Sequence, residues 1–397
     1  MKRNKRFVIT VAVIILVCLM AIPAYFVMLK LGMTSIKITD NYSAYSYKYE
    51  NNVFDVIDNK VYGLENEMEN RVINYFPLYF EANSLYSSAK LKVNSLLSDK
   101  KAIYCGSNGN EKLFYNQEND FMYAITEYSD TEIERRFNQQ VEFFNSLDTG
   151  DAQLYLYYPT IVELTDLTEY SKASYIERFE KQLNSDITVG HMTVNDYDTY
   201  KKFFFSSDHH WSAYGATDGY NTIMNMLLGK PENTFSYKKA VNKKTYGSLA
   251  KDTMLQVGSD DFYVIDVDNN LEVEVPNYAE NWYKPLEVEE SDLRYYDYYI
   301  GYYNGQYDEV ILHNKENEDG ENIMIICDSF AWPIDYLIGQ DFKDTYVINF
   351  RYGRWHNEKI DIAESVKAAN ISKVLFIYDG MSLLFDSNNY DFAARIE

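Results

Sequence analysis

The pattern of apolar and polar positions divides the chain into an apolar N-terminal run, a polar stretch, and a long region of helix-like and strand-like segments. A basic flank precedes an uncharged, almost entirely apolar stretch over residues 7–29. A run of this length can span a bilayer, and the positive-inside rule keeps the basic flank cytoplasmic. We therefore predict a single-pass transmembrane signal anchor over residues 1–30, with the bulk of the chain extracytoplasmic. A cleaved signal peptide is the alternative.

The anchor is followed by a polar, tyrosine-rich stretch over residues 31–60, which predicts a stalk. From residue 65 to about 98 the pattern is that of an amphipathic helix interrupted at Pro77, and residues 103–114 predict two strands joined by a turn. The segments that follow begin the alternation of an α/β fold. We expect a helix over 131–147, a strand over 153–158, and helices over 171–183 and 212–228.

The α/β pattern returns in the C-terminal part of the chain. Residues 322–327 form a short apolar run that is typical of an interior parallel strand. We expect a helix over 332–338, a strand over 345–350, a helix over 357–369 and a strand over 373–378. Residues 231–320 are instead loop-rich, acidic and strand-like, and we interpret them as a β-rich insertion or lid. The sequence thus predicts one α/β domain over residues 61–397, a parallel sheet with flanking helices.

Charge and composition narrow the range of partners. The net charge of −23 argues against binding a nucleic acid or an anionic lipid surface through a basic face. The 39 tyrosines favour a surface that faces a glycan. The cysteines, Cys18, Cys105 and Cys327, form no metal motif, and Cys18 lies in the apolar run. A disulfide between Cys105 and Cys327 is therefore the alternative to free thiols.

The strongest chemical signal is the sequence Asp208-His209-His210-Trp211, which holds two of the five histidines. In an extended backbone Asp208 and His210 share a face, and an acid beside an imidazole can fix its tautomer and stabilise its protonated form. Two alternatives remain open. Asp208 is also suited to cap the helix over 212–228, and the histidines could bind a metal, although the other histidines lie in no ligand spacing.

A candidate nucleophile, Ser329, follows the apolar run over 322–327 and precedes a predicted helix. In an open parallel sheet, ligands bind at the carboxyl ends of the strands, and backbone N–H groups at a helix start suit an oxyanion hole. The alternative is that Ser329 is only a helix N-cap. Together with Asp208 and His210, Ser329 completes a set of nucleophile, base and orienting acid.

The motifs over residues 207–216, 327–330 and 349–352 resemble the DHHW family, which is similar to the SGNH-like O-acetyltransferases of alginate and other exopolysaccharides. The resemblance covers roughly residues 60–395. It implies an SGNH-hydrolase-like, flavodoxin-like fold in which the Asp-x-His pair precedes the serine, a permuted order. It further implies Ser329 as nucleophile, His210 as base and Asp208 as its orienter. Cys327 stands where these enzymes usually have glycine, and no Gly-x-Asn-Asp block is present.

Three further residues are candidates for substrate binding or oxyanion stabilisation: Arg351, Trp211 and Tyr352. The expected function is a membrane-anchored O-acetyltransferase that modifies a cell-wall or secreted polysaccharide through an acyl-enzyme, without a metal or a cofactor. By resemblance, a multi-pass membrane acyltransferase would supply the acyl groups. Two alternatives stay open: an esterase with the same triad, and a non-catalytic glycan-binding or assembly subunit.

Overall fold

The computed structural model describes residues 79–397 with gaps at 99, 109–110, 279–282, 284–287, 289, 291–294, 303–306, 357 and 389. Residues Tyr86–Glu397 form one compact unit. The expected anchor over residues 1–30 and the stalk over 31–60 lie outside the described residues. Within the described part, no helix is both long enough and apolar enough to cross a membrane.

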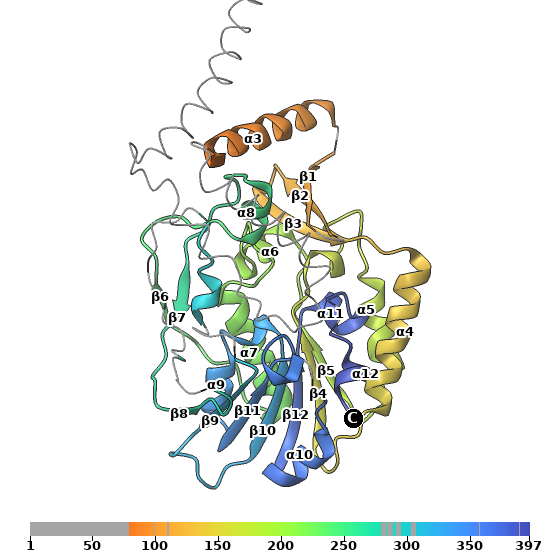
Figure 1. Cartoon of the computed structure of the whole chain (residues 1–397), viewed down its shortest axis with the longest axis vertical. Helices are drawn as coiled ribbons and strands as arrows, with labels where there is room; N and C mark the ends of the chain where they lie inside the picture. The colour runs from red at the N-terminus through yellow and green to blue at the C-terminus, as the bar shows by residue number, and fades with distance from the viewer. Residues whose placement is uncertain are drawn as a thin grey trace, which may run out of the picture. The chain divides into compact units, whose positions relative to one another are not determined.

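A seven-stranded, mostly parallel sheet forms the centre of the described chain (Figure 1). Its strands, in spatial order, are β5 (Thr188–His191), β4 (Gln153–Tyr158), β12 (Ile371–Ile377), β10 (Asn322–Cys327), β11 (Asp344–Ile348), β9 (Glu309–His313) and β8 (Glu272–Glu274). The five strands from β5 to β11 are parallel, whereas β9 and β8 add antiparallel pairs at one edge. The predicted parallel α/β sheet is confirmed.

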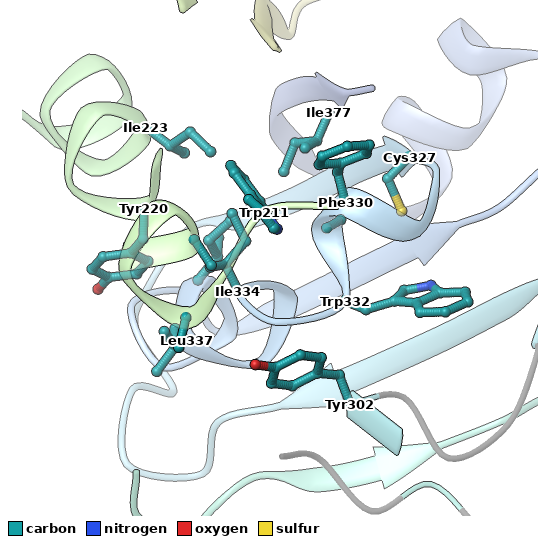
Figure 2. Close-up of a cluster of buried hydrophobic side chains, with 14 of the residues drawn as sticks. Trp211, Tyr220, Ile223, Tyr302, Cys327, Phe330, Trp332, Ile334, Leu337 and Ile377 are labelled. Carbon is teal, nitrogen blue, oxygen red and sulfur yellow. The ribbon is translucent and has the colours of Figure 1, made fainter. Parts of the chain in front are cut away.

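Both faces of the sheet are covered, which explains why its interior strands are continuous apolar runs. Along β10, Ile323 and Ile325 pack into one cluster of buried side chains, and Met324 and Ile326 pack into another. Alternate side chains of a strand point to opposite faces, so the two clusters are the two sides of the sheet. Figure 2 shows part of the first cluster, in which Trp211 and Phe330 lie close together.

Helices on each side supply the covering. The first cluster includes buried residues of α7 (Ala213–Leu228) and α9 (Asp335–Gly339). The second draws on α4 (Asp130–Ser146), α5 (Ser174–Gln182), α10 (Ile362–Ala369), α11 (Gly380–Phe385) and α12 (Phe392–Arg395). Short connections are η2 (Val162–Leu164), α6 (Tyr197–Phe203), η3 (Tyr299–Tyr302), η4 (Ser329–Ala331) and η5 (Arg354–His356). The result is a three-layer arrangement of helices, sheet and helices.

A smaller antiparallel sheet is built from β1 (Ala102–Asn108), β2 (Glu111–Asn116) and β3 (Phe121–Thr126). Helix α8 (Ser248–Thr253) packs on it through Leu249 and Ala250, which join Ile103 and Met122 in a third buried cluster. Helix α3 (Tyr79–Leu97) contributes the buried Leu91 to the same cluster. The strand-turn-strand predicted over 103–114 is confirmed, and β3 extends it.

The segment over 231–320, interpreted from sequence as an insertion or lid, is only partly separate from the core. Strands β6 (Tyr237–Lys239) and β7 (Tyr263–Ile265) pair with each other, whereas β8 and β9 extend the central sheet. Cys105 and Cys327 are both buried and free. The alternative of a Cys105–Cys327 disulfide is therefore wrong.

Candidate active site

Ser329 lies at the carboxyl edge of the central sheet. Strand β10 ends at Cys327, and Ser329 is the first residue of the 3₁₀ turn η4. The N-cap of this turn is Asp328, whose side chain accepts the N–H of Phe330 at 2.9 Å. The alternative that Ser329 is itself the cap is therefore wrong. Only 4% of Ser329 is exposed, so packing around the turn that follows β10 holds the side chain in place.

His210 reaches Ser329 through a bend between α6 and α7. Phe204 and Trp211 form an isolated bridge, and the N–H of Phe205 donates to the carbonyl of His210 at 3.1 Å. Gly215 permits the two helices to approach, because a Cβ there would lie 2.2 Å from the carbonyl oxygen of Phe203. The backbone at Asp208 is bent, so the extended conformation assumed from sequence is wrong. The pairing of Asp208 with His210 nevertheless occurs.

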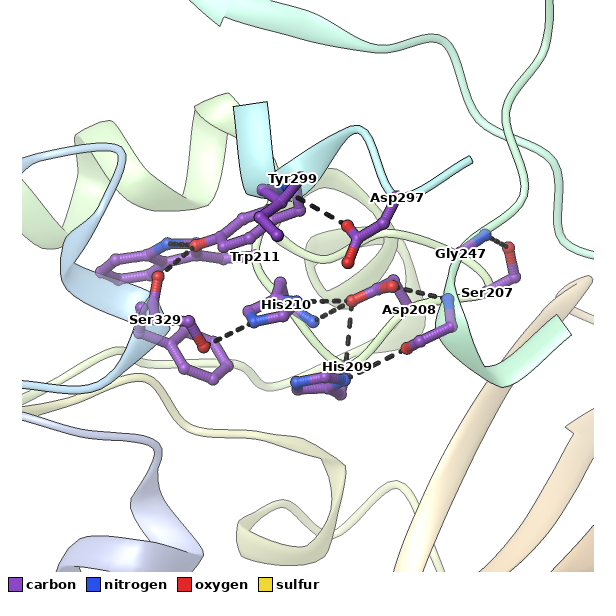
Figure 3. Close-up of polar contacts among 12 residues, drawn as sticks. Ser207, Asp208, His209, His210, Trp211, Gly247, Asp297, Tyr299 and Ser329 are labelled. Carbon is purple, nitrogen blue, oxygen red and sulfur yellow. Dashed lines mark hydrogen bonds and ion pairs between the residues drawn. The ribbon is translucent and has the colours of Figure 1, made fainter. Parts of the chain in front are cut away.

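A continuous hydrogen-bonded chain links Asp208, His210 and Ser329 (Figure 3). Asp208 Oδ1 lies 2.6 Å from His210 Nδ1, and His210 Nε2 lies 2.8 Å from Ser329 Oγ. With the Nδ1 proton donated to the carboxylate, Nε2 is free to accept the serine proton. The three residues predicted from sequence are therefore brought together in the geometry of a nucleophile, a base and its orienter.

Both carboxylate oxygens of Asp208 accept hydrogen bonds. Its Oδ1 also accepts the backbone N–H of His210 at 3.0 Å, and its Oδ2 accepts the N–H of Ser248 at 2.7 Å. Burial acts to raise the pKa of Asp208, but the charge of His210 and these hydrogen bonds outweigh it and hold the pKa below its usual range. Helix α7 is capped by Ser212, so the alternative that Asp208 is its N-cap is wrong.

Arg351 is the second predicted residue, after His210, that contacts the Ser329 hydroxyl. Its Nη1 donates to Ser329 Oγ at 3.3 Å. The Ser329 N–H stands at the first position of η4, where N–H groups have no acceptor within the helix. These two donors can stabilise an oxyanion at Ser329, whereas the next N–H, of Phe330, is already bound to Asp328.

Trp211 and Tyr352 do not occupy the positions that their candidate role requires. Trp211 is completely buried beneath the site, and its Nε1 donates to the hydroxyl of Tyr299 at 3.1 Å, so direct contact with a substrate is excluded. Tyr352 is half-buried and packs against the first cluster. Its ring lies 5.6 Å from the guanidinium carbon of Arg351, within the range of a cation–π contact. Tyr352 thus contacts the site through Arg351.

Ser329, His209 and Arg351 line a cavity of about 520 Å³, a size typical of small-ligand sites. Its wall also carries the carboxylates Glu111, Asp252 and Asp379. Burial and neighbouring carboxylates raise the pKa of Glu111 to about 7, and burial together with Asp379 raises that of Asp328 to about 7. The cavity beside the nucleophile is therefore rich in acidic groups.

Potential metal ligands in the site are already used in hydrogen bonds. Asp208, His209 and His210 offer donor atoms within 4.8 Å of one another. However, Asp208 Oδ1 and both ring nitrogens of His210 belong to the chain that ends on Ser329. His209, with half of its side chain exposed, contacts the Ser248 hydroxyl at 3.3 Å. A metal on these atoms would have to break the serine-histidine-aspartate connection, so these residues fit the triad better than a metal centre.

Two residues of the site were not identified from sequence, and both come from the segment over 231–320. Ser248 holds Asp208 through its N–H, and Tyr299 stacks on His210 with ring centroids 3.8 Å apart. Gly247 allows α8 this approach, since a Cβ there would lie 2.4 Å from Asp208 Cβ. Neither residue stands in a motif, so the sequence carries no local signal for either.

Comparison with solved structures identifies proteins with the same architecture. Bacillus cereus PatB1 with a sulfonyl adduct is 20% identical over 70% of this chain and 98% of that chain, with a TM-score of 0.54. A second structure of PatB1 is 20% identical over 70% of this chain and 99% of that chain, with a TM-score of 0.53. A DHHW family protein from Eubacterium siraeum is 14% identical over 74% of this chain and 97% of that chain, with a TM-score of 0.51.

The chain has the fold of PatB1 and of this DHHW family protein. The resemblance drawn from the motifs is thus confirmed at the level of the fold. No protein-family model and no curated protein matches the sequence. At identities of 20% and 14%, the comparison shows a shared fold but not a shared reaction. The reaction depends on the residues around Ser329.

Proposed function

We propose that this chain is a membrane-anchored, extracytoplasmic O-acetyltransferase that modifies a cell-wall or secreted polysaccharide through an acyl-enzyme on Ser329. The observation that carries the proposal is the connection from Asp208 through His210 to Ser329, at 2.6 and 2.8 Å, beside a cavity. The similarity to PatB1, a peptidoglycan O-acetyltransferase, supports polysaccharide O-acetylation in general. The permuted order of the SGNH-like motifs is consistent with the same assignment.

In the first step, Ser329 Oγ attacks the acyl carbonyl of the donor while its proton passes to His210 Nε2. The donor's leaving group departs with that proton, and an ester remains on Ser329. In the second step, His210 takes the proton of a sugar hydroxyl, whose oxygen attacks the ester. Ser329 leaves and recovers the proton. Asp208 stabilises the charged imidazole in both steps, and Arg351 and the Ser329 N–H stabilise the oxyanion.

The expected membrane anchor determines which acyl donors Ser329 could reach. A chain held by residues 1–30 on the outer side of the membrane has no direct access to cytoplasmic acyl donors. We therefore include in the proposal a multi-pass membrane acyltransferase that carries acyl groups across the bilayer and passes them to Ser329. The acceptor is the polysaccharide.

The proposal is tested by supplying an acceptor. The full-length protein, purified in detergent, is incubated with 4-nitrophenyl acetate, with and without cell-wall oligosaccharides. We expect acetyl esters on the oligosaccharide, detected by mass spectrometry, and faster nitrophenol release when the acceptor is present. Nitrophenol release without sugar acetylation would identify an esterase. If the protein releases no nitrophenol and carries no acetyl group, the non-catalytic subunit becomes the better assignment.

Arg351→Ala is expected to lower kcat/KM for 4-nitrophenyl acetate on the order of 100-fold, the effect of removing one oxyanion donor. Arg351→Lys should recover part of this loss, since it restores the charge without the planar donor pair. The matched control is Arg354→Ala, which removes a nearby guanidinium that pairs with Glu309. Equal losses in the Arg351 and Arg354 variants would argue against a role of Arg351 at the oxyanion.

A further inference from the structure

Tyr299 covers one ring face of the proposed base. It is the first residue of η3, in the segment over 231–320, and its ring stacks on the imidazole of His210 with centroids 3.8 Å apart and planes inclined by 12° (Figure 3). The hydrogen bond to Asp208 holds one corner of the imidazole, at Nδ1. A ring held at one corner can still swing Nε2 away from its target. The stacked phenol restricts that movement.

The Tyr299 hydroxyl connects the same residue to the nucleophile. It donates to the carbonyl oxygen of Ser329 at 3.0 Å and accepts the Nε1–H of Trp211 at 3.1 Å. Only 3% of Tyr299 is exposed, and burial raises the pKa of the phenol well above its usual range, so it stays protonated and can donate. Tyr299 therefore contacts the imidazole with its ring and the backbone of Ser329 with its hydroxyl.

The ring also favours the charge that the base acquires. When His210 takes the proton of Ser329, a cation forms 3.8 Å from the face of an aromatic ring. The negative face of an aromatic ring attracts a cation at this range. The stabilisation is larger for the protonated imidazole than for the neutral one, so it acts on the state in which the serine is nucleophilic.

We propose that Tyr299 is the positioning residue of this site, which keeps His210 Nε2 aligned with Ser329 Oγ and couples the segment over 231–320 to the reactivity of the serine. The inference rests on the proposed function, because it assigns Ser329 and His210 as the reacting groups. It gives that segment a role at the site in addition to its structural role.

Neighbouring Tyr302 supplies the control. It is equally buried, packs edge-on against Tyr299 with centroids 5.2 Å apart, and donates its hydroxyl to the carbonyl of Tyr263 at 2.7 Å. Tyr302→Phe therefore removes a buried tyrosine hydrogen bond from the same cluster without altering a contact of Tyr299 to His210 or Ser329. It reports the effect of a purely structural loss.

The test measures the rate at which phenylmethanesulfonyl fluoride labels Ser329 in the full-length protein, followed by intact mass. In this reaction the Oγ–S bond forms, the S–F bond breaks, the serine proton passes to His210 and fluoride leaves. Tyr299→Phe keeps the ring and loses a neutral hydrogen bond, so labelling should slow about tenfold. Tyr299→Leu also loses the ring, and labelling should slow on the order of 100-fold, as expected for a misaligned base.

Tyr302→Phe should label at the wild-type rate, and kcat for 4-nitrophenyl acetate should follow the labelling rates while KM stays unchanged. Equal labelling of both Tyr299 variants and Tyr302→Phe would overturn the inference. If near-ultraviolet circular dichroism shows that Tyr299→Leu has lost its fold, Tyr299→Phe against Tyr302→Phe decides alone, and equal rates again overturn it. Wild-type protein that resists labelling would instead refute the nucleophile itself, and with it the proposed function.

Discussion

Ser329→Ala is expected to abolish formation of the acyl-enzyme and to lower kcat for 4-nitrophenyl acetate by a factor on the order of 10⁴ or more. The substitution removes the hydroxyl that His210 contacts at 2.8 Å, and it leaves neither an attacking oxygen nor a proton to transfer. Because Ser329 is almost fully buried and alanine is smaller by one oxygen, the fold should be retained. Intact mass should show an acetyl adduct on the wild-type protein and none on the variant.

A serine at the other edge of the sheet provides the control for this experiment. Ser372 lies near the start of β12, and its hydroxyl donates to the carbonyl of Asn322 at 3.2 Å, where β10 begins. Ser372→Ala therefore removes one serine hydrogen bond at the edge opposite to Ser329 and should keep wild-type turnover. Full activity in Ser329→Ala would require another nucleophile and would refute the acyl-enzyme mechanism.

Two interior strands of the sheet could be predicted from sequence residue by residue. The expected strands over 153–158 and 322–327 coincide with β4 and β10. Strands that are buried on both faces are short, continuous apolar runs, and Pro159 ends the first run because proline cannot donate to a ladder. The helix over 212–228 was equally clear, since Ser212 caps it and Gly229 ends it in the left-handed region.

Other boundaries depended on tertiary structure or on proline. The helix expected over 332–338 begins only at Asp335, as α9. The turn η4 precedes the expected range, and Pro333, which has no N–H to donate, lies between η4 and α9. The helix expected over 357–369 begins at Ile362, where Asp361 caps it through the N–H of Glu364. The expected strand over 345–350 ends at Ile348, after which the chain turns toward Arg351.

The residues of the candidate site could be predicted from sequence, but their assembly could not. Asp208 and Ser329 were identified by residue type and by place in the fold, although 119 positions separate His210 from Ser329. Tyr299 and Ser248 could not be identified, because Tyr299 acts through a ring face and a hydroxyl that contacts a backbone carbonyl, and Ser248 acts through its backbone N–H. A ring face can come from any aromatic residue, and a backbone N–H can come from any residue except proline. Only the packing of the segment over 231–320 brings them to His210 and Asp208.

Asp208→Asn is expected to lower kcat by about 10⁴-fold with little change in KM, as for a triad that loses its orienting carboxylate. Both oxygens of Asp208 accept: Oδ1 from His210, and Oδ2 from the N–H of Ser248 at 2.7 Å. An asparagine has only one acceptor oxygen, and its other terminal group is the donor NH₂. If the NH₂ group faces Ser248, it meets the N–H of Ser248, which is also a donor. If it faces His210, the imidazole must take the tautomer that carries its proton on Nε2, and that tautomer cannot accept the proton of Ser329.

The control for this variant is a second aspartate-histidine pair with a similar distance between Oδ1 and Nδ1. Asp344 Oδ1 lies 2.7 Å from Nδ1 of His313, on the paired strands β11 and β9. Asp344→Asn breaks that pair without touching Ser329, so activity should remain at the wild-type level. A comparable loss of activity in both variants would assign the effect to stability and not to the orientation of His210.

The loss of stability caused by Asp208→Asn should become smaller as the pH falls. Because the pKa of Asp208 is lower in the folded chain than its unfolded value of about 4, the carboxylate contributes stability above that pH and loses it as the pH falls toward the folded value. The difference in free energy of unfolding between wild type and Asp208→Asn should thus be largest near neutral pH and shrink below about pH 4. Urea unfolding at pH 7 and pH 3.5 measures it. A difference that grows on acidification would mean that Asp208 is held protonated, in which case it could not stabilise a charged His210.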